Sequence, residues 1–152
     1  MERMEEKIPS TQYDPLQYFL SDSDWDYRPV NDQTAKDVDK MLGAHDDSAL
    51  CIDETGFPKK GKMSIGVARQ WCGQQDKTDN FQVGLFATLG QDRFSNPIDF
   101  RLYLLREWTE NKRRCLKAKV PPEHRQLRSK HELALERVLN ARKRGIRFNW
   151  VG

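Results

Sequence analysis

The chain lacks any long apolar run. No stretch of its 152 residues approaches the roughly 20 consecutive apolar residues that a membrane helix needs. The first seven residues, MERMEEK, are mostly charged and lack the apolar centre of a signal peptide. We therefore expect no membrane partner and a cytoplasmic location.

Cysteine and histidine are scarce, with three of each, and they are scattered along the chain. Cys51, Cys72 and Cys115 show no CxxC spacing, so neither a disulfide framework nor a zinc site is indicated. The histidines are equally far apart, and surface or capping roles suit them better than metal ligation.

Charge of one sign is scarce at each end of the chain. Residues 1–50 contain 12 acidic against 5 basic residues, a net charge of −7, whereas residues 101–152 contain 5 acidic against 15 basic residues, a net charge of +10. A basic C-terminal third suggests contact with a polyanion, although a solvated basic surface is an equally good explanation of charge alone.

The first 47 residues predict a small helical N-terminal region. Asp32 to Leu42 has the spacing of a helix that buries Val38, Met41 and Leu42. A short apolar stripe before it consists of Leu16, Phe19 and Leu20. We expect residues 48–152 to form the main domain.

From residue 48 onward the pattern becomes that of strands. Residues 49–52 form a continuous apolar run, as in a strand buried on both faces, and the polar and turn-forming residues that follow are expected to end it. Residues 63–67, 81–87 and 98–104 alternate between apolar and polar positions. Short connections between such strands predict an antiparallel meander.

A helix and a final strand are expected after the basic connection formed by residues 106–130. Ser129 and Glu132 fit a helical capping box, and Gly145 stands where a C-cap belongs. The apolar face of this helix is predicted to consist of Ala134, Leu135, Val138, Leu139 and Ala141. Residues 146–151 alternate again and predict a last strand, and a chain that stops there suggests an incomplete domain.

A near-match to a phosphate-binding P-loop begins at Gly56. The spacing Gly56-x-x-x-x-Gly61-Lys62 is present, but Met63 stands where Ser or Thr would bind magnesium. The following residues alternate as a strand does, whereas a P-loop leads into a helix. Nucleotide binding is therefore a minor alternative.

Asp53 is the main candidate for chemistry. A carboxylate after an apolar strand is often only a turn-forming or capping residue. It could also ligate Mg²⁺, which prefers hard oxygen ligands on a rigid frame. Glu54 should point to the opposite side of the strand and so cannot pair with Asp53, and two-metal phosphoryl transfer needs several carboxylates.

Basic side chains are concentrated in two segments near this carboxylate. The candidates for contact with nucleic-acid phosphates are Lys59, Lys60, Lys62, Arg69, Lys112, Arg113, Arg114, Lys117 and Lys119. Trp71, Trp108 and Trp150 could stack on bases, although core or rim positions are more common for tryptophan.

Several motifs, in order, resemble insertion-sequence transposases with a DDE endonuclease domain. The first catalytic block of that family is similar to CIDETGFPKKG at residues 51–61, and the next block to GVARQWCG at residues 66–73, where Tyr is more usual than Trp71. The likeness continues through NFQVG (80–84), FRLYL (100–104), KRRCLKAKVPP (112–122) and, upstream, LQYFLSDSDWD (16–26). It covers about residues 15–152, and Leu105 departs from the proline usual at that place.

The resemblance implies an α/β, ribonuclease-H-like fold that is incomplete in this chain. Its parts would be a mixed sheet with an antiparallel meander, one packing helix, a parallel final strand and a small helical N-terminal region. Asp53 would be the first catalytic and metal-binding carboxylate. The family's second Asp and its Glu would lie beyond Gly152.

Intact members of that family would cut and join DNA by in-line phosphoryl transfer with Mg²⁺ or Mn²⁺, first to water and then to a freed 3′-hydroxyl. We therefore predict a truncated transposase that is inactive alone. Its expected partners are transposon-end DNA and full-length transposase. The alternative is a DNA-binding regulatory remnant that occupies element ends or inhibits the full-length enzyme.

Overall fold

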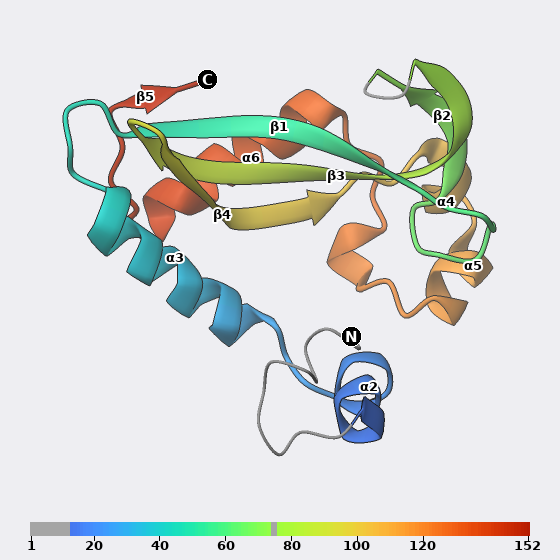
Figure 1. Ribbon diagram of the computed structural model, residues 1–152. Coiled ribbons are helices and arrows are strands. Elements are labelled where there is room, and N and C mark those ends of the chain that lie inside the picture. The colour runs from blue at the N-terminus through green and yellow to red at the C-terminus, as the bar shows by residue number, and fades with distance from the viewer. Residues whose placement is uncertain (1–12, 74–75) are drawn as a thin grey trace. The chain divides into compact units, whose positions relative to one another are not determined.

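The computed structural model describes residues 13–73 and 76–152 (Figure 1). Two compact units divide between Asn31 and Asp32. The first contains α2 (Tyr13–Ser21), and α3 (Arg28–Leu42) spans the division. In the predicted apolar stripe, Phe19 is exposed and stacks on Trp25 with ring centroids 5.2 Å apart, while the side chains of its other two members lie outside the described residues.

A curled mixed sheet forms the centre of the second unit (Figure 1). Its strands are β1 (Ala49–Pro58), β2 (Ala68–Cys72), β3 (Lys77–Gln91), β4 (Phe94–Leu102) and β5 (Trp150–Val151). The long β3 pairs antiparallel with β1, β2 and β4, and β5 pairs in parallel with β1. This mixed sheet is the one expected from the resemblance.

Residues 63–67 do not form the predicted strand. They bend in a turn in which the Val67 N–H donates to the Ser64 carbonyl at 3.1 Å and Gly66 has φ of 76°. Within this turn Val67 is buried and its carbonyl accepts a 2.8 Å hydrogen bond from the Trp108 indole, and Ile65 packs against the cluster that contains Trp108. The second strand therefore starts only at Ala68, and β1 pairs directly with β3.

The final strand is shorter than predicted. Only Trp150 and Val151 pair with β1, opposite Ala49 and Leu50. Ile146 and Phe148 are buried in the core before the chain reaches the sheet edge.

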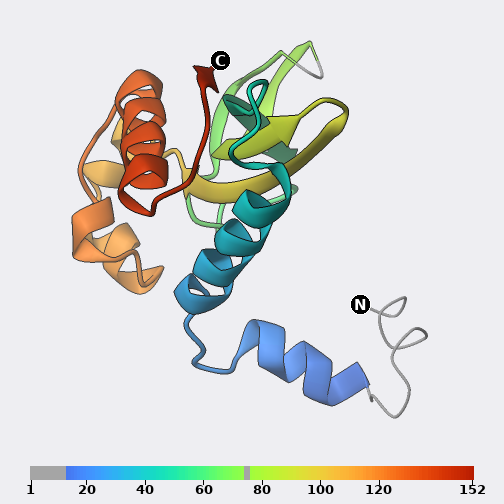
Figure 2. The same cartoon turned by 90° about the vertical axis from the view of Figure 1, so that its left-hand side faces the viewer.

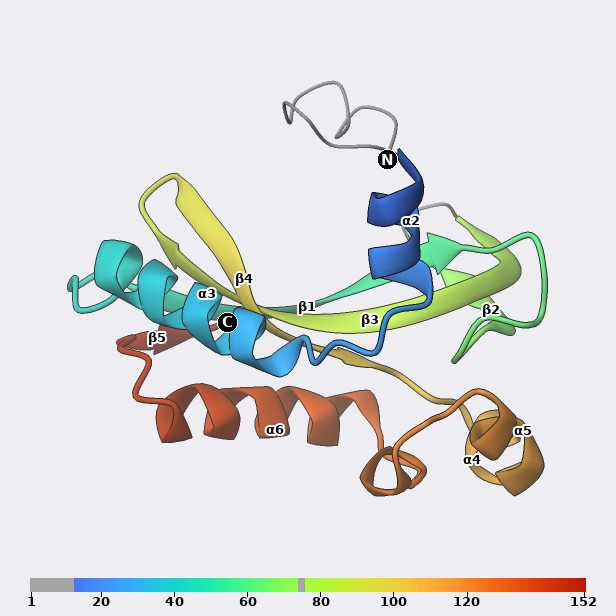
Figure 3. The ribbon, with the colours of Figure 1, turned by 90° about the horizontal axis from the view of Figure 1, so that it is seen from below.

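Four helical segments lie between β4 and β5: α4 (Arg106–Thr109), α5 (Lys112–Lys117), the 3-10 helix η1 (Pro122–His124) and α6 (Lys130–Lys143). Figures 2 and 3 show α6 running along one face of the sheet. The capping box of Ser129 and Glu132 is confirmed. The predicted apolar face is partly wrong, because Leu135 and Leu139 are each 59% exposed.

The α6 residues that face the sheet are Leu133, Arg137 and Ala141, which recur at every fourth position. The main core joins Ala141 to Leu50, Leu89 and Ile98 of the strands, and Val38 of α3 belongs to it as well. The predicted boundary at residues 47/48 stays a prediction, but α3 shares a core with the sheet.

No helix among the described residues is long and apolar enough to cross a membrane.

Candidate functional site

Asp53 lies in the middle of β1, because the strand continues to Pro58 where we predicted a turn. The extension is held by β3, whose residues Phe81 to Leu85 pair with Pro58 to Glu54. The β5 segment accompanies β1 only as far as the bond from the Ile52 N–H to the Gly152 carbonyl, 2.8 Å. Asp53 directly follows Ile52, and its side chain therefore lies close to the place where β1 meets the parallel segment.

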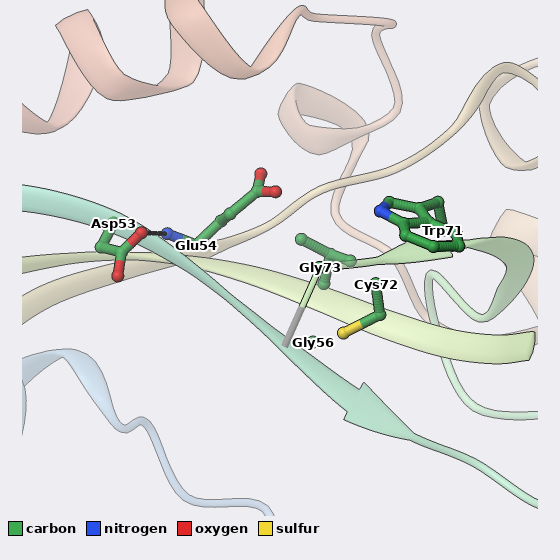
Figure 4. Close-up of a pocket in the computed structure, with 7 residues that line it drawn as sticks. Asp53, Glu54, Gly56, Trp71, Cys72 and Gly73 are labelled. Carbon is green, nitrogen blue, oxygen red and sulfur yellow. Dashed lines mark hydrogen bonds between the residues drawn. The ribbon is translucent and has the colours of Figure 1, made fainter. Parts of the chain in front are cut away.

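The Asp53 side chain is exposed on the strand face opposite to Leu50 and Ile52. One carboxylate oxygen accepts a 2.7 Å hydrogen bond from the backbone N–H of Glu54. Figure 4 shows the Glu54 side chain pointing to the other side of the strand, where its carboxylate pairs with Lys130 of α6 at 2.5 Å. The two neighbouring carboxylates thus belong to different faces, as alternation along a strand requires.

A metal centre would need more ligands than this arrangement provides. Among residues 13–73 and 76–152, no group of three Asp, Glu, His or Cys side chains is placed to hold a metal ion. The nearest second carboxylate in sequence, Glu54, is turned away and neutralised by Lys130. The described residues therefore do not fit a two-metal site by themselves.

A cavity of about 240 Å³ lies beside the candidate carboxylate (Figure 4). Its lining comes from β1, the end of β2 and Val83 of β3, and consists of Asp53, Glu54, Gly56, Trp71, Cys72, Gly73 and Val83. The Cys72 side chain of β2 can lie against Gly56 of β1 because Gly56 has no side chain: a Cβ at that position would lie 2.7 Å from the Cys72 sulfur.

Two of the predicted basic segments come together. The loop after β1 carries Lys60 and Lys62, both exposed, and Arg114 of α5 donates a 2.8 Å hydrogen bond to the Lys62 carbonyl. Lys112, Arg113 and Lys117 are exposed on α5, and Lys119 is exposed just after it. Lys59 is half-buried, and Arg69 is exposed on β2.

Arg114 differs from the other basic candidates because its guanidinium is already engaged. Its central carbon lies 3.7 Å from the centre of the Trp108 ring, and a nitrogen lies 3.8 Å from a Glu107 carboxylate oxygen. With the bond to the Lys62 carbonyl, this side chain has three partners within the protein.

Of the three tryptophans considered for stacking on bases, one is buried and two are exposed. Trp108 is buried and its indole N–H donates a hydrogen bond to the Val67 carbonyl, so it is a core residue. Trp150 is exposed and its indole N–H donates to the Asp46 carbonyl at 3.0 Å. Trp71 is exposed at the cavity beside Asp53.

The P-loop alternative fails on geometry. The residues that follow Lys62 turn and enter β2, so the loop does not lead into a helix, as phosphate binding of that kind requires.

The histidines are not gathered at the candidate site. Burial lowers the pKa of His124, and the positive charge of Arg101 acts in the same direction. His124 borders a small pocket with Arg101, Gln126 and Arg128, which lies between η1, β4 and the start of α6.

One buried charged residue, Arg137, was not predicted from the sequence. Arg137 of α6 pairs with Asp99 of β4 at 3.1 Å and with Glu136 at 2.7 Å, and it donates to the Phe100 carbonyl at 3.2 Å. The available signal was its spacing: Arg137 stands four residues after Leu133 and four before Ala141, both buried.

The fold and the site together define a mixed α/β protein of the ribonuclease-H-like class with an exposed carboxylate on its first strand. A family model described as DDE superfamily endonuclease matches residues 1–151, so the chain belongs to that family. The family implies a transposase-like nuclease function, a DNA substrate and, generally, the use of divalent metals. Comparisons with curated proteins and with solved structures gave no match.

Proposed function

We propose that this chain is part of the catalytic domain of a DNA transposase, which cuts and joins DNA by phosphoryl transfer, and that Asp53 is one of its catalytic carboxylates. The observation that supports this role is the place of Asp53 in a DDE family chain: it is exposed on the first strand, directly after Ile52, which bonds to the parallel segment that contains β5. A carboxylate there stands on a rigid frame and remains open to a partner.

The 152-residue chain alone does not cleave DNA in this proposal. Phosphoryl transfer of the expected kind needs several carboxylates around its metal ions. Among the described residues no group of three metal-ligating side chains forms at Asp53, and the Glu54 carboxylate is bound to Lys130. The predicted Mg²⁺ or Mn²⁺ therefore requires ligands beyond this set, and we assign no metal-dependent step to the chain. The cytoplasmic location likewise stays a prediction.

A plasmid-nicking assay tests this proposal. Supercoiled DNA is incubated with the purified chain and either Mg²⁺ or Mn²⁺, and the Asp53→Asn variant serves as the control. The expected result is that neither protein produces nicked circles. Nicking by the wild-type chain that the Asp53→Asn variant lacks would show that the chain is active alone.

A regulatory role is the second candidate, and the exposed basic residues of the 59–62 loop and α5 favour it. A chain that binds DNA without cutting it could occupy transposon ends or enter oligomers of full-length transposase. Preference for a terminal-repeat duplex over a shuffled duplex of equal length would support the first form. Binding of both duplexes with equal affinity would contradict the occupation of transposon ends. A fall in the activity of full-length transposase when the chain is mixed in would support entry into its oligomers.

A further inference from the structure

The strongest unexplained feature outside the Asp53 region is the close approach of two cationic segments. The lysine loop is defined here as residues 59–62, with Lys59, Lys60 and Lys62. Its start is tied to β3, because the Lys59 N–H donates to the Asn80 carbonyl at 2.9 Å. Its end is tied to α5 by the bond from Arg114 to the Lys62 carbonyl. The loop is therefore held against a helix of the same charge.

The cations of these two segments, apart from Arg114, have no carboxylate partner in the part of the chain that the structure describes. Among residues 13–73 and 76–152, no ion pair involves Lys59, Lys60, Lys62, Lys112, Arg113, Lys117 or Lys119. Elsewhere in the basic C-terminal third, six basic side chains each pair with a carboxylate: Arg106, Arg128, Lys130, Arg137, Arg144 and Arg147. Unpaired like charges that are held together repel one another, and an external polyanion relieves that repulsion.

Arg114 makes the two segments one surface. Its guanidinium lies over the Trp108 ring, donates to the Lys62 carbonyl of the lysine loop and lies near the Glu107 carboxylate, so these contacts hold it in place. A planar fork can stack on a ring and donate sideways at the same time, which a lysine ammonium cannot do.

We propose that the lysine loop and α5 form a single surface for the phosphate backbone of duplex DNA, with Arg114 as its positioning residue and not as a phosphate ligand. This inference rests on the proposed function, since the family supplies the DNA substrate. Lysines on two segments suit the phosphates of a duplex because such contacts need charge and spacing, without base recognition.

Salt dependence of binding to a short duplex of fixed sequence tests the proposal, because each phosphate contact contributes about 0.9 to the slope of log K against log salt. Lys60→Ala with Lys62→Ala should lower that slope by about 2. Arg114→Lys should lower it by a similar amount although the formal charge is unchanged, since the lysine loop is then released.

The matched control is Arg142→Lys. Arg142 also stacks on an aromatic ring, with its central carbon 3.8 Å from the centre of Phe148, and it also donates to a backbone carbonyl, at 3.0 Å. This variant loses a comparable set of contacts away from the proposed surface, so it should keep the wild-type slope. Circular dichroism and thermal melting verify that each variant is folded.

A folded Arg114→Lys chain with the wild-type slope would overturn the role of Arg114. If that variant does not fold, two double variants test the surface in its place. The first is Lys60→Ala with Lys62→Ala, and the second is Lys112→Ala with Lys117→Ala. Each should lower the slope, and an unchanged slope for either one overturns the joint surface. Absence of salt-dependent binding by the wild-type chain would remove the DNA-binding proposal as well, whereas the nicking assay tests the catalytic proposal separately.

Discussion

Arg137 of α6 and Asp99 of β4 form an ion pair of 3.1 Å in which the side chains are only 6% and 12% exposed. The same guanidinium holds Glu136 and the Phe100 carbonyl, while its Nε has no hydrogen-bond partner among the described residues. The ion pair between Arg137 and Asp99 is thus nearly excluded from water, and it holds α6 against β4.

Replacing Arg137 with Met should destabilise the chain strongly. Methionine retains apolar volume, but it leaves the Asp99 carboxylate buried without a counter-charge, and breaking a buried pair in this way costs about 3–5 kcal/mol. Urea unfolding measures the loss. Arg106→Met is the control, because its pair with Glu110 is exposed and should change the free energy of unfolding by less than about 1 kcal/mol. Equal effects of the two substitutions would contradict the fastening role of Arg137.

Gly56→Ala should destabilise the region around the cavity. The added Cβ would lie 2.7 Å from the buried Cys72 sulfur, and overpacking of this kind costs about 1–3 kcal/mol. Gly61→Ala is the control, since a Cβ there meets nothing within 4 Å.

The Cys72→Ala substitution identifies the clashing atom. Once the sulfur is removed, Gly56→Ala should cost much less than it does in the wild-type background, and the difference measures the coupling between the two positions. Additive effects of the two substitutions would show that the strands do not meet at this contact.

The capping box of α6 should make stability depend on pH. The hydrogen bond from the Ser129 backbone N–H, helped by the Ser129 hydroxyl, lowers the pKa of Glu132 below its usual 4.5. Its contribution is therefore present above pH 4.5 and is lost as the pH falls through the folded-state pKa. Unfolding free energies measured on either side of that window should differ less in Glu132→Gln than in the wild-type chain.

Ser129→Ala tests the other half of the same box. It removes the hydroxyl that accepts the Glu132 N–H, and such a loss costs about 1 kcal/mol at neutral pH. A variant that melts like the wild-type chain would mean that the cap contributes nothing to stability.

Local patterns in the sequence predicted the elements whose cause is local. The capping box is set by two residues three positions apart, and the alternation of Phe81, Val83 and Leu85 follows from one buried face of β3. Each of these can be recognised without knowledge of distant partners.

The errors came from tertiary contacts that no local pattern contains. β1 passes through Gly56 and Pro58 because β3 pairs with it along that length. Residues 63–67 alternate but form a turn, and the Val67 carbonyl there accepts a hydrogen bond from the Trp108 indole, 41 positions away. In α6, the buried Arg137 shifts the inward face and leaves Leu135 and Leu139 exposed.

At the candidate site, the parallel pairing of β5 with β1 agrees with the predicted final strand, whereas the role of Asp53 stays a prediction. The engagement of Arg114 could not be predicted, because it depends on a ring and a loop carbonyl brought from elsewhere in the fold.

Asp53→Asn should leave the stability of the chain nearly unchanged, and this distinguishes a functional carboxylate from a turn-forming one. An aspartate that shapes a turn or caps a helix contributes to stability. Asp53 instead lies inside a strand and is exposed, and within the described part of the chain its side chain accepts one hydrogen bond, from the adjacent Glu54 N–H. Substitution at such a surface position normally changes the free energy of unfolding by less than about 0.5 kcal/mol. Asp99→Asn, which weakens the buried pair with Arg137, is the contrasting variant and should be clearly destabilising. If urea unfolding shows Asp53→Asn to be as damaging as Asp99→Asn, then the Asp53 carboxylate has a structural role and its proposed place in catalysis loses its support.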